Sequence, residues 1–166
     1  MRLAIRYPEM LKSLTLLETS ADPEPDETVP KYSLLNFIAR WLGLRIVVGQ
    51  VMPILLGKTF MSDPSRKALR DTWREYIVSH NRLGITRAVK GVIDRNGVYE
   101  QLDKITTPTL IMVGDEDIAT VPEKSERMHA KIQGSQLVTI PNAGHSSTIE
   151  EPDFVSDAIV QFLNDL

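Results

Sequence analysis

Apolar residues along this chain follow two patterns, and each pattern predicts a different kind of element. Short, mainly apolar runs occupy residues 13–17, 109–113 and 136–140. Runs of this length that end at Gly, Pro or charged residues are typical of strands buried on both faces of a parallel sheet. Elsewhere, apolar residues recur every three or four positions, which predicts helices with one buried face. Together the two patterns predict an α/β fold.

The last third of the chain predicts a strand–helix–strand unit with a right-handed crossover. Its helix spans about ten residues, begins at Pro122 and has Glu123 in its first turn, where the helix dipole favours negative charge. A final helix begins at Pro152. We expect its apolar stripe to pack on the sheet; the stripe comprises Phe154, Val155, Ala158, Ile159, Phe162 and Leu163.

The middle of the chain predicts helices only. Residues 21–30 form an acidic, proline-rich connector that we expect not to be helical. We therefore divide the chain into a core segment (1–21, a helix end and one strand), a helical lid (22–98) and a second core segment (99–166). A helical insertion between two pieces of a parallel sheet is typical of a lid.

Three helical stripes stand out in this predicted lid, and we interpret them as packing surfaces. They are Leu34, Leu35, Ile38, Trp41 and Leu42, ended by Gly43; Leu69, Trp73 and Ile77, after a cap at Asp63 and Pro64; and Ile85, Ala88, Val89, Val92 and Ile93, ended by Asn96 and Gly97. The stretch 46–56 is apolar on more than one face, so packing and the lining of an acyl or ring pocket both remain open. We interpret Trp41, Trp73 and His80 as structural.

Composition narrows the classes of function. The net charge is −3 and no basic cluster occurs, which argues against a nucleic-acid partner. The absence of cysteine excludes disulfides, a cysteine nucleophile and thiolate metal sites. The three histidines are widely spaced, so we expect no metal and no cofactor. Arg2, Arg6 and Pro8 interrupt the first apolar stretch, which argues against a signal peptide. Residues 44–56 are too short to span a bilayer. We expect no membrane contact and a cytoplasmic location.

Candidate chemistry follows two of the predicted strands. Gly114-Asp115-Glu116-Asp117 comes after the strand 109–113, and Gly144-His145 comes after the strand 136–140. The carboxyl ends of parallel strands meet at one edge of a sheet, where ligands gather. Histidine is a base near neutrality, and a carboxylate on its other nitrogen stabilises the imidazolium. We therefore predict that Asp117 and His145 form an acid–base pair; the alternatives are a solvated acidic turn and a surface histidine.

In a catalytic triad, an acid–histidine pair of this kind activates a third residue, the nucleophile. No such nucleophile is recognisable in this sequence. The sequence contains no Gly-x-Ser-x-Gly and no cysteine. Ser146 and Ser147 follow the histidine directly but lack the strand-to-helix elbow that presents a nucleophilic serine.

The motifs Pro108-Thr109-Leu110, Gly114-Asp115-Glu116-Asp117, Ala143-Gly144-His145-Ser146 and Glu150-Glu151-Pro152 resemble the carboxyl end of an α/β-hydrolase. Residues 1–9 resemble the end of the helix that follows the nucleophile, and residues 12–18 resemble the next strand. The resemblance, which is nearest to the 3-oxoadipate enol-lactonase-like group, implies a partial fold with the last three parallel strands, flanking helices and a lid. It assigns the triad acid to Asp117 rather than Asp115, and the base to His145.

That resemblance also implies that the first strands, the oxyanion hole and the nucleophile lie before Met1, so we expect an in-frame Gly-x-Ser-x-Gly upstream. We expect a serine hydrolase of small esters, lactones or related acyl substrates, inactive as this chain alone. The alternatives are a non-catalytic binding or assembly module, and one half of a split hydrolase. Dehalogenases, peroxidases and C–C hydrolases share the scaffold. A homodimer or a separate amino-terminal half are the macromolecular partners that we expect.

Overall fold

The computed structural model describes residues 1–166, which group into two units. The first unit comprises Met1–Asp22, Ile54–Ser62 and Gly97–Leu166, and it contains every strand. The second unit comprises Pro23–Pro53 and Asp63–Asn96, and its secondary structure consists of helices without strands. None of the helices combines the length and the apolar character needed to cross a bilayer.

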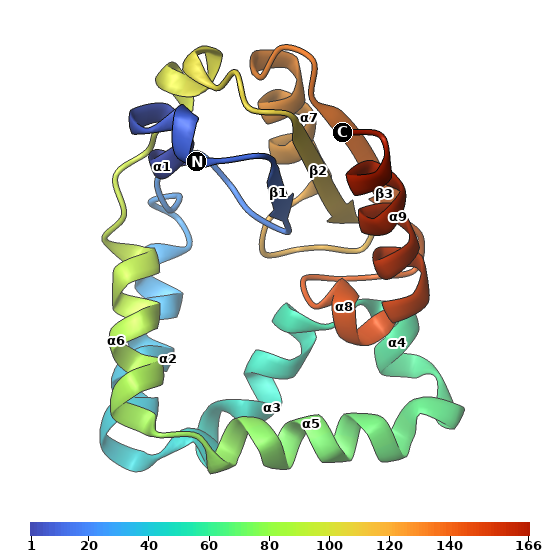
Figure 1. The fold of residues 1–166 in the computed structure, drawn as a ribbon. Helices are drawn as coiled ribbons and strands as arrows, with labels where there is room; N and C mark the ends of the chain where they lie inside the picture. Colours follow the sequence, from blue (N-terminus) through green and yellow to red (C-terminus); the bar gives the residue numbers. More distant parts are fainter. The chain divides into compact units, whose positions relative to one another are not determined.

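The strands of the first unit form a parallel sheet in the order β1-β2-β3 (Figure 1). They are β1 (Leu14–Leu17), β2 (Thr109–Gly114) and β3 (Gln136–Ile140). Leu14 aligns with Thr109, and Leu110 aligns with Gln136. Every residue of the central strand β2 is buried, as its mainly apolar run predicts. The predicted α/β class, with three parallel strands and flanking helices, is confirmed.

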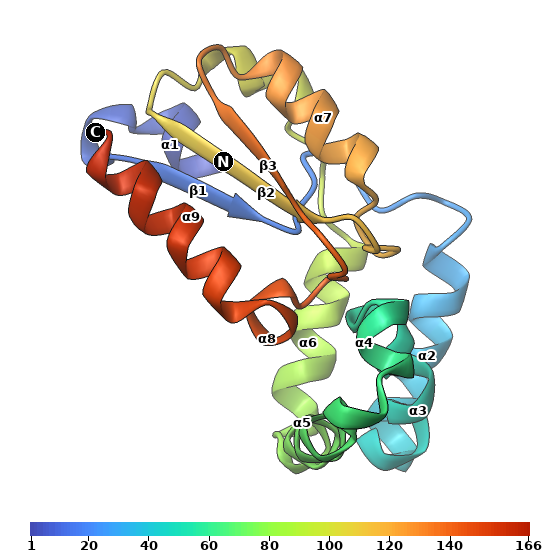
Figure 2. The same cartoon turned by 90° about the vertical axis from the view of Figure 1, so that its right-hand side faces the viewer.

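Helices cover both faces of this sheet (Figure 2). On one face, Ile111 packs in a cluster with residues from α1 (Arg2–Arg6), the 3-10 helix η3 (Tyr99–Lys104) and α7 (Pro122–Lys131). On the other face, its neighbours Leu110 and Met112 pack against α9 (Pro152–Asn164). The alternation follows from the two-residue period of a strand, which sends successive side chains to opposite faces.

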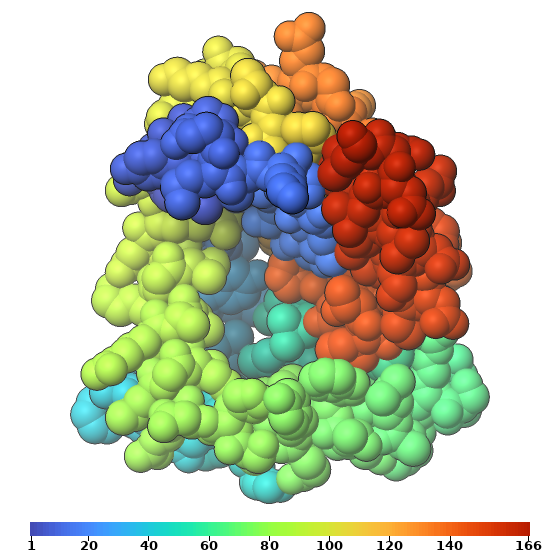
Figure 3. All heavy atoms as spheres, in the orientation of Figure 1, coloured from blue at the N-terminus to red at the C-terminus, as the bar shows by residue number.

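The final helix α9 begins at Pro152 as predicted, but its buried face is narrower than the predicted stripe. Val155 and Phe162 are buried, whereas Phe154 is 41% exposed and Leu163 is 49% exposed. Consecutive residues on a helix do not share a face, so Val155 and Phe162 are buried while their neighbours Phe154 and Leu163 are exposed, and Ala158 and Ile159 are both half-buried against the same core cluster. The outer side of α9 forms part of the surface in Figure 3 (red).

In the second unit, α2 (Val29–Leu42) and α6 (Arg82–Ile93) lie side by side. The connector prediction was wrong at its end, because α2 already begins at Val29. Pro30 fits there because the first turn of a helix needs no hydrogen bond from its N–H groups. Gly43 ends α2 with a φ of +106°, a conformation that glycine adopts without strain. The remaining helices of this unit are α3 (Leu44–Leu55), η2 (Pro64–Arg66) and α5 (Lys67–Ser79).

Four short helical elements were not predicted individually from the sequence: η1 (Pro8–Met10), α4 (Lys58–Ser62), η3 and α8 (Ser147–Glu150). Within the range 22–98 that the sequence assigns to the lid, residues 54–62 group with the first unit. Two side chains of the first unit hold this segment: Glu116, in the turn after β2, and Glu150, at the end of α8.

Candidate active site

The carboxyl ends of all three strands carry a titratable residue of the candidate site. Glu18 follows β1, the acidic turn Asp115 to Asp117 follows β2, and His145 lies in the turn after β3. Because the strands are parallel and adjacent, these ends share one edge of the sheet. The topology therefore places the acid and the histidine at the edge where the sequence predicts them.

Asp117 is held by the residues that follow it. Its Oδ1 accepts hydrogen bonds from the N–H groups of Ala119 (2.8 Å) and Thr120 (2.9 Å). Its Oδ2 accepts a third bond, at 2.7 Å, from the Thr120 hydroxyl. The Asp117 side chain has no exposed surface. A short loop thus fixes both carboxylate oxygens before the histidine is considered.

The structure brings Asp117 and His145 together. The distance from His145 Nδ1 to Asp117 Oδ2 is 2.9 Å, and the Thr120 hydroxyl lies 3.3 Å from the same nitrogen. Since a carboxylate only accepts, Nδ1–H is the donor and Nε2 is the basic nitrogen of the neutral ring. The His145 side chain keeps 29% of its surface exposed, so the ring is accessible to small molecules.

Asp117 is poised to stay ionised. Burial opposes its charge, but the hydrogen bonds from His145 and Thr120 and the histidine's charge outweigh burial and lower its pKa. A buried carboxylate that stays charged stabilises a neighbouring imidazolium. Asp115 has a different setting, because its side chain is exposed and its N–H donates to Ile140 O at 3.0 Å.

Backbone packing ties the acid turn to the histidine turn. The N–H of Glu116 donates to Ala143 O at 2.9 Å. Gly114 lies so close to this turn that a Cβ atom on it would sit 2.1 Å from Ala143 O. Only glycine allows this approach, which explains the glycine that begins the acidic motif.

Two further carboxylates hold the segment Gly57–Thr59 against these turns. Glu150 accepts from the N–H groups of Gly57 (2.7 Å), Gly144 (3.0 Å) and Ser146 (3.3 Å). Glu116 accepts from the Thr59 N–H at 2.7 Å and from its hydroxyl at 2.6 Å. Burial raises the pKa of Glu150, against the effect of its hydrogen bonds. The start of α4 is therefore bonded to the acid turn through Thr59, and the preceding Gly57 shares the carboxylate of Glu150 with the histidine turn.

Glu18 is a further carboxylate near His145, and the sequence analysis missed it. It is 9% exposed, and its Oε1 accepts a hydrogen bond from the hydroxyl of Ser147. A signal was available, because a glutamate directly after a buried strand occupies the same position as the acid motif after β2. No comparable local signal points to Glu150 or Thr120.

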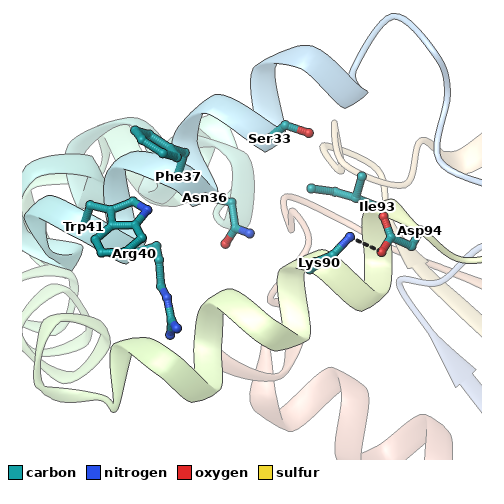
Figure 4. Close-up of a pocket in the computed structure, with 8 residues that line it drawn as sticks. All are labelled: Ser33, Asn36, Phe37, Arg40, Trp41, Lys90, Ile93 and Asp94. Carbon is teal, nitrogen blue, oxygen red and sulfur yellow. Dashed lines mark hydrogen bonds and ion pairs between the residues drawn. The ribbon is translucent and has the colours of Figure 1, made fainter.

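A separate open pocket of about 280 Å³ lies in the helical unit, between α2 and α6 (Figure 4). Asn36 Oδ1 and Arg40 Nη1 are buried there without a hydrogen-bond partner. The Lys90 ammonium pairs with Asp94. None of the lining residues belongs to the acid–histidine pair; they are Ser33, Asn36, Phe37, Arg40, Trp41, Lys90, Ile93 and Asp94. No group of three or more His, Cys, Asp or Glu residues is arranged to hold a metal ion.

Comparison with known proteins adds a family. The sequence profile described as "Alpha/beta hydrolase family" matches residues 3–158. A proline iminopeptidase of Saccharolobus solfataricus is 42% identical over 74 residues, which are 45% of this chain and 24% of that protein. A pimeloyl-[acyl-carrier protein] methyl ester esterase of Neisseria meningitidis is 26% identical over 148 residues, 87% of this chain and 56% of that protein.

Solved structures give a consistent result. A thermophilic esterase from Thermogutta terrifontis has a TM-score of 0.85 and 30% identity, covering 98% of this chain and 59% of that one. The enol-lactonase from Burkholderia xenovorans has a TM-score of 0.86 at 22% identity, covering 98% of this chain and 60% of that one, which supports the fold alone. The chain therefore spans about three fifths of the length of these two proteins, in agreement with a partial α/β-hydrolase fold.

Proposed function

The chain belongs to the α/β-hydrolase family, and from that premise we propose that it supplies the acid and the base of a hydrolase of small esters, lactones or related acyl compounds. One observation carries the proposal. His145 Nδ1 lies 2.9 Å from an oxygen of Asp117, a carboxylate with no exposed surface. This is the arrangement that activates a hydroxyl nucleophile.

Each residue has a defined part in the proposed reaction. His145 takes the proton of a nucleophilic hydroxyl through Nε2 and later donates it to the leaving group. Asp117 fixes the tautomer of the ring and stabilises the imidazolium as it forms. The N–H groups of Ala119 and Thr120 and the Thr120 hydroxyl donate to the Asp117 carboxylate and keep it in place. The helical unit is proposed to be the lid of the substrate site.

The nucleophile is not part of this sequence, which has no Gly-x-Ser-x-Gly. Ser147 is fully buried and donates to Glu18, and Ser146 is the N-cap residue of a short helix and does not lie in an elbow. We therefore propose that the 166-residue chain has no hydrolase activity by itself. Loss of the nucleophile typically lowers turnover by about a millionfold.

Esters are favoured as substrates by the relatives that align along most of the chain. The Thermogutta terrifontis esterase and the Neisseria meningitidis methyl ester esterase cover 98% and 87% of it, whereas the iminopeptidase covers 45%. The acid–histidine pair itself serves many reactions on this scaffold. The substrate class thus rests on the relatives, and the roles of Asp117 and His145 rest on the geometry.

The test of the acid–base pair needs no nucleophile. Asp117→Asn removes the charge beside the imidazole, so the titration midpoint of His145 falls by about one unit or more. Asp115→Asn removes an exposed charge two residues away and leaves the midpoint in place. Hydrogen–deuterium exchange at histidine Cε1, read by mass spectrometry over a pH series, measures both. An unchanged midpoint in Asp117→Asn would contradict the proposed roles.

Activity is tested by adding a nucleophile. The chain is fused to the part of the Thermogutta terrifontis esterase that lies outside the match, and hydrolysis of p-nitrophenyl butyrate is followed. His145→Ala abolishes turnover, and Asp117→Asn lowers it by about four orders of magnitude. The unfused chain hydrolyses nothing and is not labelled by a fluorophosphonate. Labelling of a single serine in the unfused chain would contradict the proposed need for a further nucleophile.

A further inference from the structure

Glu18 adopts a backbone conformation that its residue type rarely takes. Its φ is +39°, in the left-handed region, although it is not glycine. Its N–H still donates to Met112 O at 3.0 Å, so the strand pairing continues to this residue. Residues persist in such strained conformations where their surroundings fix them, and they cluster at functional sites. Here the buried Glu18 side chain is the group that the surroundings fix.

What fixes that side chain is the turn that carries His145. Ser147, the first residue of α8, lies two positions after His145, and its hydroxyl donates to Glu18 Oε1. Ser147 has no exposed surface. The bond joins residues 129 positions apart in the sequence, and thereby joins the end of β1 to the histidine turn. No lysine or arginine pairs with Glu18, so its charge is not neutralised by a basic side chain.

The charged groups that act on Glu18 are those of the candidate site. His145 favours its ionised form, whereas Asp117 and Glu150 oppose it. A buried carboxylate without a cation is costly, and the imidazolium is the cation that the site offers. Glu18 and His145 therefore stabilise each other when both are charged.

From these contacts we infer that Glu18 is a positioning residue for His145, holding the histidine turn through Ser147 and adding a second negative charge that favours the imidazolium. This inference rests on the proposed function, in which His145 is the base. It adds a carboxylate that follows β1 to the acid that follows β2. Both then influence the protonation of the imidazole that follows β3.

The electrostatics agree with this geometry. Burial raises the pKa of Glu18 to about 7, while the Ser147 hydrogen bond and the charge of His145 act in the opposite direction. Histidine ordinarily titrates in the same range. Two groups that titrate together and interact release their protons as a pair, so changing one changes the profile of the other.

Glu18→Gln separates charge from structure, because the amide oxygen still accepts from Ser147 while the charge is gone. Histidine Cε1 exchange in the 166-residue chain is read by mass spectrometry over a pH series, as for Asp117. We expect the His145 midpoint to fall by about half a unit, less than for the closer Asp117. The profiles of His80 and His129, both exposed, stay unchanged and serve as internal references.

Ser147→Ala gives a second route to the same result. Without its donor, Glu18 is less readily ionised, so the His145 midpoint falls again while the carboxylate remains. If circular dichroism shows that Glu18→Gln does not fold, the smaller change Ser147→Ala tests the inference in its place. Asp115→Asn, which removes an exposed carboxylate on the acid turn, is the matched control and leaves the His145 midpoint unchanged.

An unmoved His145 midpoint in folded Glu18→Gln, or in Ser147→Ala, overturns the inference and leaves Glu18 with a structural role only. The proposed function has its own readout, the shift in Asp117→Asn. If that shift is present while Glu18→Gln has no effect, the inference on Glu18 alone has failed. If neither variant moves the midpoint, the acid–base pair itself is wrong.

Discussion

At the scale of single residues, the site consists of carboxylates whose settings differ. Asp117 is buried, but hydrogen bonds lower its pKa, so it stays charged. Glu18 is also buried and has one bonded donor, and burial raises its pKa to about 7. Asp117 is bonded directly to His145 and accepts from Thr120, whereas Glu18 has one donor and faces the charges of Asp117 and Glu150, and these contacts account for the difference. One group is thus a fixed charge near neutral pH, and the other is a titrating one.

The raised pKa of Glu18 predicts a pH-dependent effect on stability. Its folded pKa of about 7 lies above its ordinary value of 4.5, so its contribution to stability is full below about pH 4.5 and is lost as the pH rises through 7. Glu18→Gln cannot ionise and escapes this loss. We expect the variant's melting temperature, relative to the wild type, to rise between pH 5 and pH 8, as followed by circular dichroism. A difference that stays constant over this range would contradict a titrating, buried Glu18.

The sequence predicts the acid–histidine pair because its signals are local. Asp117 and His145 each follow a recognisable strand within a few residues, and parallel strands bring those ends together. The supporting carboxylates have no such signal. Glu150 binds an N–H group 93 residues away, and Glu18 binds a hydroxyl 129 residues away. Periodicity describes one segment at a time, so contacts between distant segments emerge only in the folded chain.

At the scale of elements, Glu150 connects α8, the histidine turn and the segment before α4. Its carboxylate accepts three backbone N–H groups, from Gly57, Gly144 and Ser146. Gly57 and Gly144 approach so closely that a Cβ on Gly144 would lie 2.3 Å from Gly57 N. The three donors therefore depend on Glu150.

We predict that Glu150→Ala destabilises the chain by about 3 kcal/mol, because buried donors without an acceptor cost roughly 1–3 kcal/mol each. Urea unfolding measures the loss, and faster amide exchange at Gly57 and Gly144 locates it. Glu126→Ala, at an exposed position on α7, is the control and changes stability by less than about 0.5 kcal/mol. Equal effects of the two substitutions would show that Glu150 does not hold these segments together.

At the scale of the molecule, the sheet has an open edge at β1. This strand pairs with β2 alone. Leu14 N–H donates to Pro108 O and Glu18 N–H donates to Met112 O, and hydrogen bonding alternates along a parallel strand. The N–H groups of Thr15 and Leu17 therefore point away from the sheet. An apolar strand with outward N–H groups is a template for pairing with another chain.

We predict that the 166-residue chain, produced on its own, self-associates through β1, most simply as a two-fold dimer with antiparallel β1 strands. Thr15→Pro blocks that pairing without removing a bond to β2, because edge strands tolerate proline where the N–H faces outward. Sedimentation velocity should show the wild type as dimers or larger species and Thr15→Pro as a monomer. Leu14→Pro, at the first residue of β1, removes the N–H that donates to Pro108 O but keeps the outward N–H groups of Thr15 and Leu17, so this control should still associate. If the wild type sediments as a monomer, or if Thr15→Pro associates equally, β1 is not the edge through which copies of this chain meet.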